Sequence, residues 1–154
     1  MKTILQRVSE ANVSVDGEVV GAIGQGLLVL FCAETSDSSA QQGQIDYFAR
    51  KIATMRIFED GSGKMNLSVK DIGGSALVIS QFTLAAEWRN GNRPSFSGAA
   101  SPDVGKALYD GFCAALADQV LDVETGEFGA RMEVSLVNSG PVTIVMDDLK
   151  NEKK

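Results

Sequence analysis

Residues 12–23 have the sequence Asn-Val-Ser-Val-Asp-Gly-Glu-Val-Val-Gly-Ala-Ile, which predicts a β-hairpin. Polar and apolar residues alternate over residues 12–15, Asp16-Gly17 is typical of a two-residue type I′ turn, and residues 18–23 form the returning strand. The continuous apolar run at residues 27–32, Leu-Leu-Val-Leu-Phe-Cys, predicts a strand that is buried on both faces. The fold is therefore built on β structure from its first residues.

Two helices are predicted to interrupt the strands. The first covers about residues 38–55, where Ser36-Asp37-Ser38-Ser39 supplies N-cap candidates and apolar residues follow the 3.6-residue period. The second starts with Ser101 at the N-cap and Pro102 at the first helical position. Each helix should bury one face against the sheet. The apolar stripe of the second comprises Val104, Leu108, Phe112, Ala115, Leu116 and Val120.

Three further strands are predicted over residues 76–84, 132–137 and 142–146, with a long irregular segment at residues 85–101. Six or seven strands with two inserted helices and no regular β–α alternation indicate an α+β fold. We expect its core to be a mixed, largely antiparallel, barrel-like sheet. A single domain should cover residues 1–147, followed by a frayed tail at residues 148–154.

The composition limits the chemistry that the chain can perform. The 154 residues include no histidine, which removes the commonest general base and metal ligand, and the net charge is −6. That charge argues against broad nucleic-acid binding, so an RNA should be contacted through a small local basic patch. The carboxylates of Asp147, Asp148 and Glu152 have no ligand spacing and are expected to be solvated. We therefore predict neither a metal nor a cofactor.

The cysteines and the N-terminal residues indicate the cellular compartment in which the protein is expected to work. Cys32 and Cys113 lie in apolar runs without a CxxC pair, which is typical of buried thiols in a reducing environment. Residues 1–7 lack the apolar core of a signal peptide, and no apolar stretch approaches the length of a membrane span. A cytoplasmic protein without membrane contact is expected.

The segment Ser80-Gln81-Phe82-Thr83-Leu84 ends the strand predicted before the long loop. On a strand, Ser80, Phe82 and Leu84 would face one way, and Gln81 and Thr83 the other. A hydroxyl nucleophile here would need an activating base, and none lies at a recognisable spacing. Backbone N–H groups at a strand end could instead bind a developing oxyanion. An ordinary strand with incidental hydroxyls is the simpler alternative.

The segment Asn138-Ser139-Gly140-Pro141 separates the last two predicted strands and is most simply a turn, since proline cannot donate to a sheet ladder. The alternative is a cis Gly140-Pro141 peptide. Such a step would present adjacent carbonyl oxygens in a fixed orientation. They could hold an ammonium group and close one face of its carbon, which would make a chirality filter of main chain.

Both segments resemble a known family. Ser80 to Leu84 is similar to the SQFTL motif of D-aminoacyl-tRNA deacylases, and residues 138–143, Asn-Ser-Gly-Pro-Val-Thr, are similar to their NxGPVT motif. The resemblance starts at the opening strand and covers nearly all of residues 1–147. It also includes Leu5-Gln6-Arg7-Val8, Gly63-Lys64-Met65-Asn66, Arg93-Pro94-Ser95-Phe96 and Leu136-Val137-Asn138.

The resemblance implies an enzyme. The family hydrolyses the ester that joins a D-amino acid, or mischarged glycine, to the terminal adenosine at the 3′ end of tRNA. Its members need no cofactor and are homodimers, in which the Gly-cis-Pro step of one subunit enters the active site of the other. By this resemblance, Gly140 and Pro141 are the chiral selector and are supported by Arg7 and Met132.

The same resemblance implies the roles of the remaining site residues. Ser80, Gln81, Phe82 and Thr83 would line the pocket for the aminoacyl-adenosine, with Phe96 contacting the substrate. Backbone N–H groups around residues 81–83 would bind the oxyanion, making Gln81, Phe82 and Thr83 the catalytic residues, while the RNA 2′-hydroxyl assists the attack of water. A competing proposal makes Thr83 the nucleophile, and the lack of an obvious base favours the RNA-assisted route.

Other features leave alternatives open. Glu87 and Trp88 belong to the variable part of the long loop and receive no role, while Lys64, Arg89 and Arg93 are candidates for the local basic patch. A non-catalytic, nucleic-acid-associated module on the same fold is the main alternative function. A small-molecule D-amino acid esterase is the third.

Overall fold

The computed structural model describes residues 1–38, 42–120 and 122–147. Its helices are α1 (Gln42–Thr54) and α2 (Pro102–Ala117), and a 3₁₀ helix, η1, covers Phe82–Ala85. The α+β class expected from the sequence is confirmed. The strands are β1 (Lys2–Val15), β2 (Glu18–Ile23), β3 (Gly26–Cys32), β4 (Phe58–Glu59), β5 (Met65–Leu67), β6 (Ser75–Ser80), β7 (Asp122–Thr125) and β8 (Met132–Asp147).

Strand β1 organises the sheet, because three other strands pair with it. The predicted hairpin is confirmed: β2 returns antiparallel to β1, and Asp16 and Gly17 have φ angles of 51° and 81°, as a type I′ turn requires. β3 pairs antiparallel with the first half of β1, and β8 pairs antiparallel along its other edge. β6 is parallel to both β3 and β7, so the sheet is mixed.

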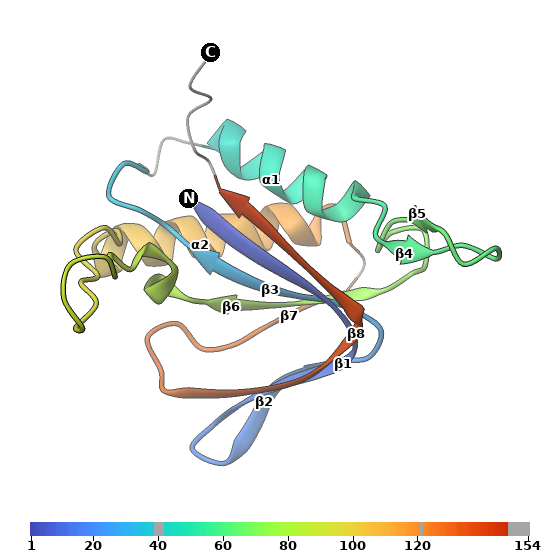
Figure 1. The fold of residues 1–154 in the computed structure, drawn as a ribbon, viewed down its shortest axis with the longest axis horizontal. Helices are drawn as coiled ribbons and strands as arrows, with labels where there is room; N and C mark the ends of the chain where they lie inside the picture. The colour runs from blue at the N-terminus through green and yellow to red at the C-terminus, as the bar shows by residue number, and fades with distance from the viewer. Residues whose placement is uncertain (39–41, 121, 148–154) are drawn as a thin grey trace.

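Both helices lie on the same side of the sheet (Figure 1), and the main core lies between the helices and the sheet. Leu27, Val29 and Phe31 of β3 belong to this core, whereas Leu28 belongs to a smaller cluster on the opposite face. β3 is therefore buried on both faces, as its apolar run predicts. A Cβ at Gly21 of β2 would come within 2.7 Å of the Thr125 carbonyl oxygen, so the sheet curls into a nearly closed barrel.

The strand predicted over residues 76–84 is shorter than expected. β6 ends at Ser80 and the chain enters η1, so the prediction that Ser80, Phe82 and Leu84 share one strand face is wrong. The cause lies in the neighbouring strands. β3 ends at Cys32 and β7 at Thr125, which leaves the residues beyond position 81 with no strand to pair with.

The turn predicted at residues 138–141 is also wrong, because β8 runs through this segment without reversing. Residues 132–138 and 143–147 both belong to the antiparallel pairing with β1. Residues 139–142 have no Cα partner on β1, and we call them the 139–142 excursion. The peptide bond between Gly140 and Pro141 is cis, which is the alternative that the sequence left open.

The helix boundaries differ little from the prediction. α1 begins at Gln42; the N-cap candidate Ser39 and the tail at 148–154 lie outside the described residues. Ser101 and Pro102 occupy the predicted N-cap and first helical positions of α2, although the Ser101 side chain makes no capping hydrogen bond. The sequence did not predict the short β4–β5 pair. No helix in the described part of the chain is long and apolar enough to cross a membrane.

Candidate active site

A cavity of about 680 Å³ lies where β6 ends. Five residues predicted from the sequence to form the site line it: Ser80, Gln81, Phe82, Phe96 and Met132. They come from the β6–η1 junction, the loop before α2 and the first residue of β8. The strand end and the long loop, which are separate in the sequence, therefore share one pocket.

Backbone donors lie at the wall of this cavity. The Gln81 N–H donates to the Phe31 carbonyl oxygen over 2.7 Å, which extends the β3–β6 ladder by one bond. The expectation that this N–H binds an oxyanion is therefore wrong. The N–H groups of Phe82 and Thr83 start η1, where a helix has no internal acceptor for its first donors, and they have no partner among the described residues. Phe82 lines the cavity, whereas Thr83, which the resemblance placed in the pocket wall, does not. One of the two donors therefore belongs to a residue of the cavity wall and the other to its neighbour in the chain.

The side chains of η1 give this wall an aromatic surface. Phe82 is 57% exposed, and its ring meets the Phe96 ring edge-on, with 5.4 Å between the ring centroids. The Gln81 Nε2 donates to Thr83 Oγ1. An amide cannot act as a base, so this contact orients the Thr83 hydroxyl without activating it as a nucleophile.

The thiol of Cys32 lies behind η1, with 3.6 Å between its Sγ and the Phe82 carbonyl oxygen. Burial, followed by the nearby charge of Glu34, raises the pKa of this thiol to about 11. Cys32 is therefore protonated at neutral pH and is not a base for the site. Its predicted burial is confirmed, whereas Cys113 is only partly buried.

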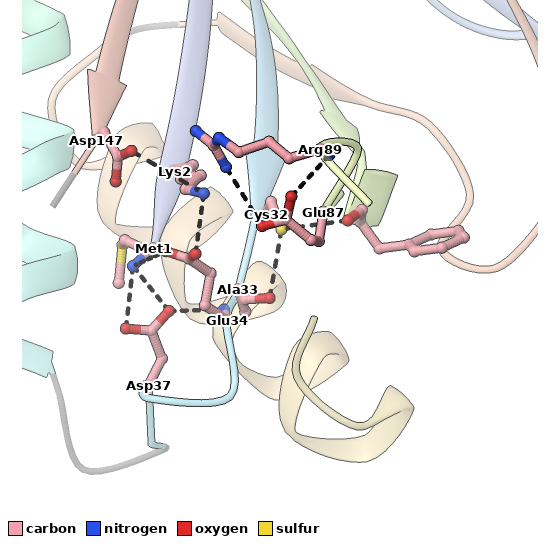
Figure 2. A network of polar contacts seen from close by, with 10 residues as sticks. Met1, Lys2, Cys32, Ala33, Glu34, Asp37, Glu87, Arg89 and Asp147 are labelled. Carbon is pink, nitrogen blue, oxygen red and sulfur yellow. Dashed lines mark hydrogen bonds and ion pairs between the residues drawn. The ribbon is translucent and has the colours of Figure 1, made fainter. Parts of the chain in front are cut away.

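A network of charged groups surrounds Cys32 (Figure 2). The Met1 ammonium lies 2.8 Å from Asp37 Oδ2 and 3.4 Å from Glu34 Oε2, and Lys2 Nζ lies 3.1 Å from Glu34 Oε1. Burial alone would lower the pKa of Lys2, but its hydrogen bond to Glu34 and the charge of that residue raise it. These carboxylates are thus engaged with cations and hold the ends of β1 and β3 together.

The second predicted motif lies elsewhere on the chain. Arg7, which is buried, donates from Nε to the Ser139 carbonyl oxygen over 2.9 Å and from Nη1 to the Ile57 carbonyl oxygen over 2.8 Å. A Cβ on Gly140 would collide with this guanidinium. Arg7 and Gly140 also line a separate cavity of about 330 Å³. The structure thus places the Arg7 guanidinium beside the Gly140-Pro141 step.

Met132 does not join Arg7 there. It lines the large cavity with Phe82, and neither Gly140 nor Pro141 lines that cavity. Within one chain, the described residues therefore do not bring the two motifs together. Pro141 and Gly140 are exposed instead.

The sequence missed several residues of the large cavity, including Phe128 and Val134. An aromatic residue between Gly126 and Gly129 was the available signal for Phe128, because loop aromatics often line sites. The suggested basic patch of Lys64, Arg89 and Arg93 does not form within one chain. Figure 1 shows the β4–β5 hairpin and the loop after η1 at opposite ends of the molecule.

Arg89 is moreover paired with Glu87, with 3.3 Å between Nη1 and Oε2, and its guanidinium lies 4.9 Å from the centre of the Trp88 ring. In the described ranges, no three Cys, Asp or Glu side chains gather where they could hold a metal ion. The groups around the large cavity are thus main-chain donors, aromatic rings and a few polar side chains.

Comparisons with known proteins show which family the chain is similar to. The profile of the family described as D-Tyr-tRNA(Tyr) deacylase matches residues 4–147. A protein of Ruegeria pomeroyi named D-aminoacyl-tRNA deacylase is 60% identical over 147 residues, covering 96% of this chain and 99% of that protein. A protein of the same name from Polaromonas naphthalenivorans is 58% identical over 149 residues, covering 94% and 95%.

A solved structure described as c-Myc DNA Unwinding Element Binding Protein is also similar. It superposes with a TM-score of 0.88 at 38% sequence identity, and the match covers 96% of this chain and 98% of that one. The residues matched by the family profile, 4–147, include both motif segments.

Proposed function

The chain belongs to the D-Tyr-tRNA(Tyr) deacylase family and is a hydrolase of the aminoacyl-tRNA ester bond, and from this premise we propose how it selects and cleaves its substrate. We propose that it removes D-amino acids, and also mischarged glycine, from the 3′-terminal adenosine of tRNA. The observation that carries this proposal is the cavity at the β6–η1 junction, where the SQFTL segment provides an aromatic wall and main-chain donors that have no acceptor among the described residues.

The aminoacyl-adenosine would occupy this cavity. About 680 Å³ is within the range of pockets that hold drug-sized molecules. The exposed rings of Phe82 and Phe96 offer apolar faces for the adenine, since every base has a π-face that can stack on an aromatic side chain. Ser80, Gln81 and Met132 would complete the wall around the ester.

The chemistry would rest on main chain and RNA rather than on a side-chain nucleophile. A water molecule attacks the ester carbonyl carbon, assisted by the 2′-hydroxyl of the terminal ribose. The Phe82 and Thr83 N–H groups stabilise the oxyanion, at about 3–4 kcal/mol per donor. The bond from the carbonyl carbon to the ribose 3′-oxygen then breaks, the 3′-oxygen takes a proton, and the amino acid leaves as a carboxylate. A chain without histidine can perform this reaction because an aminoacyl ester is already activated.

The chirality filter would come from a second copy of the chain. Gly140 and Pro141 would enter the large cavity of the partner subunit and close the face on which an L side chain would lie. Glycine would pass because it has no side chain to reject. Two observations support this: both residues are exposed, and neither lines the cavity of its own chain.

The surface of β8 supports pairing of two copies. Among the described residues β8 pairs with β1 alone, so its other edge is open. Val137 and Val145 on this strand are 49% and 69% exposed. An uncovered strand edge with apolar side chains is a surface at which protein chains associate.

A non-catalytic nucleic-acid-associated module is the second candidate, which the DNA-binding description of the solved structure at 38% identity favours. Incubation with D-aminoacyl-tRNA, glycyl-tRNA and free D-amino acid esters separates the candidates. The deacylase releases tRNA from the first two and leaves the free esters nearly intact. Binding of tRNA without turnover would favour the module, and equal rates on the free esters would indicate a small-molecule esterase.

The 2′-hydroxyl proposal has its own experiment. A tRNA whose terminal adenosine carries the D-amino acid on the 3′-oxygen and lacks the 2′-hydroxyl should bind but react far more slowly than the natural substrate. An unchanged rate on this substrate would contradict assistance by the RNA.

A further inference from the structure

The pairing of β1 with β8 is irregular where the 139–142 excursion begins and ends. Gln6 pairs with Thr143 and Val8 pairs with Asn138, so the single residue Arg7 on β1 faces four residues on β8. Such an insertion removes ladder hydrogen bonds from the longer strand. Proline at position 141 removes a further backbone donor. Other groups must therefore fix the position of this segment.

The side chain of Asn138 provides two of the missing donors. Its Nδ2 donates to the Arg7 carbonyl oxygen and to the Val142 carbonyl oxygen, each over 3.0 Å. A primary amide carries two hydrogens, and both are used here. One bond reaches across to β1 and the other joins the two ends of the excursion. The Asn138 side chain thus links the excursion to β1, a role that backbone hydrogen bonds have in the regular parts of the β1–β8 pairing.

The opposite side of the excursion is held by Arg7. Its Nε donates to the Ser139 carbonyl oxygen over 2.9 Å, and its Nη1 is fixed by the Ile57 carbonyl oxygen over 2.8 Å. The backbone of Arg7 is in turn held by Asn138. Arg7 and Asn138 therefore form one connected set of contacts around Gly140, in which the amide holds both ends of the excursion. Arg7 itself is also paired with Leu27 of β3.

We propose that Asn138 is a positioning residue for chiral discrimination: its amide fixes the Ser139–Pro141 segment at the orientation that excludes L-aminoacyl esters. This inference rests on the proposed role of Gly140 and Pro141 as the filter. It adds a residue that touches neither substrate nor reacting atoms and acts only through the segment that it holds.

Asn138→Asp tests the proposal with little change in shape. An ionised carboxylate only accepts hydrogen bonds, so its oxygens would face two carbonyl oxygens without a hydrogen between them. We expect the ratio of kcat/KM for D- over L-aminoacyl-tRNA to fall at least about tenfold. Misplacement of a substrate-contacting segment by about 1 Å can change a rate by about 100-fold, so a tenfold fall needs only a small displacement. The fall should come from faster hydrolysis of the L-ester.

Asn12→Asp is the matched control. Asn12 lies on β1 opposite Ser135, outside the excursion, and the same amide-to-carboxylate change there should leave the ratio within about twofold. Asn138→Ala is the second variant if the aspartate variant does not fold, because it removes both donors without adding a charge. A folded variant at position 138 with the wild-type ratio would overturn the proposal.

A structure of Asn138→Asp separates this inference from the proposed function. If the wild-type protein hydrolyses D- and L-esters equally, the filter itself is wrong. Displacement of Ser139–Pro141 in the variant would then still support the positioning role of Asn138. An unmoved segment would contradict it, whatever the wild-type selectivity.

Discussion

The β6–η1 junction and the 139–142 excursion are two departures from regular sheet structure that arise in opposite ways. At the junction, strand pairing stops because both neighbours end, and the N–H groups of Phe82 and Thr83 find no acceptor within the part of the chain that the structure describes. At the excursion, pairing with β1 continues on both sides, and side chains hold the unpaired residues. The first region thus exposes main chain by topology, whereas the second depends on particular side chains.

This difference indicates where substitutions should change activity. At the junction the proposed chemistry belongs to backbone N–H groups, which most side-chain changes leave in place. At the excursion, Arg7, Asn138 and Gly140 each determine where the main chain lies. Substitutions should therefore affect activity most at the excursion, and removal of the Thr83 hydroxyl at the junction should have little effect.

Gly140→Ala is expected to have the largest effect. The φ of Gly140 is 116°, which L residues rarely adopt, and a Cβ there would collide with the Arg7 guanidinium. We expect the ratio of kcat/KM for D- over L-aminoacyl-tRNA to fall about 100-fold, since displacement of a positioning segment by about 1 Å can have an effect of that size. Single-turnover deacylation measures it.

Gly17→Ala is the control for Gly140→Ala. Its φ of 81° is also positive, but no atom lies within 4 Å of the added Cβ. Activity should be retained, with only a small loss of stability. Comparable falls of the D-over-L ratio in both variants would show that backbone strain in general, rather than the contact with Arg7, is responsible.

Phe96→Ala is expected to have an intermediate effect. Removing one ring of the Phe82–Phe96 pair should weaken adenosine binding by about 1–3 kcal/mol, which corresponds to roughly 5- to 150-fold in KM. The kcat value should change less. Tyr47→Ala removes another exposed aromatic ring, on α1 beside Arg50 and Lys51, and should leave KM unchanged. An unchanged KM for Phe96→Ala would remove the stacking role.

Thr83→Ala separates the two chemical routes at the junction. The backbone donors are kept, so we expect a loss of at most about tenfold, the loss of one oriented hydrogen bond to Gln81. A nucleophile would instead cost about 10⁴-fold or more in kcat. Single-turnover rates at saturating enzyme distinguish the two, and a loss of the larger size with unchanged binding would restore the nucleophile proposal.

The smallest effect is expected from the thiol behind the junction. Burial raises the pKa of Cys32 from 9.0 to about 11. The protonated thiol therefore contributes to the stability of the folded state below pH 9, and this contribution is lost as the pH rises through 11. Between pH 6 and 8, deacylation should show no inflection from Cys32. Iodoacetamide at pH 8 should leave activity intact, and rapid inactivation with alkylation of Cys32 would contradict the assigned protonation state.

The fold and the site were predictable to different extents. The Asp16-Gly17 hairpin and the β3 strand followed from local patterns, because turn chemistry and burial on both faces leave clear signals in the sequence. The end of β6 could not be predicted, since it depends on where β3 and β7 end in space. The course of β8 through Pro141 could not be predicted either, because Arg7 and Asn138 replace the lost ladder bonds from positions that no local pattern marks.

The site shows the same limit. Ser80, Phe82 and Phe96 were assigned from the resemblance, and they do line one cavity. The sequence could not show that the Gln81 N–H donates to the Phe31 carbonyl oxygen, because this bond depends on how β3 and β6 pair. Met132 illustrates the opposite case. Its assignment beside Gly140 does not hold within one chain, and only a second copy could bring the two together.

In the proposed mechanism, main chain at Gly140 and Pro141 selects between enantiomers, while cleavage uses main chain at the β6–η1 junction. The most direct test is the hydrolysis of matched D- and L-aminoacyl-tRNA by the wild-type protein under identical conditions. We expect rapid release of tRNA from the D-ester and almost none from the L-ester. Equal rates on the two esters would contradict this mechanism.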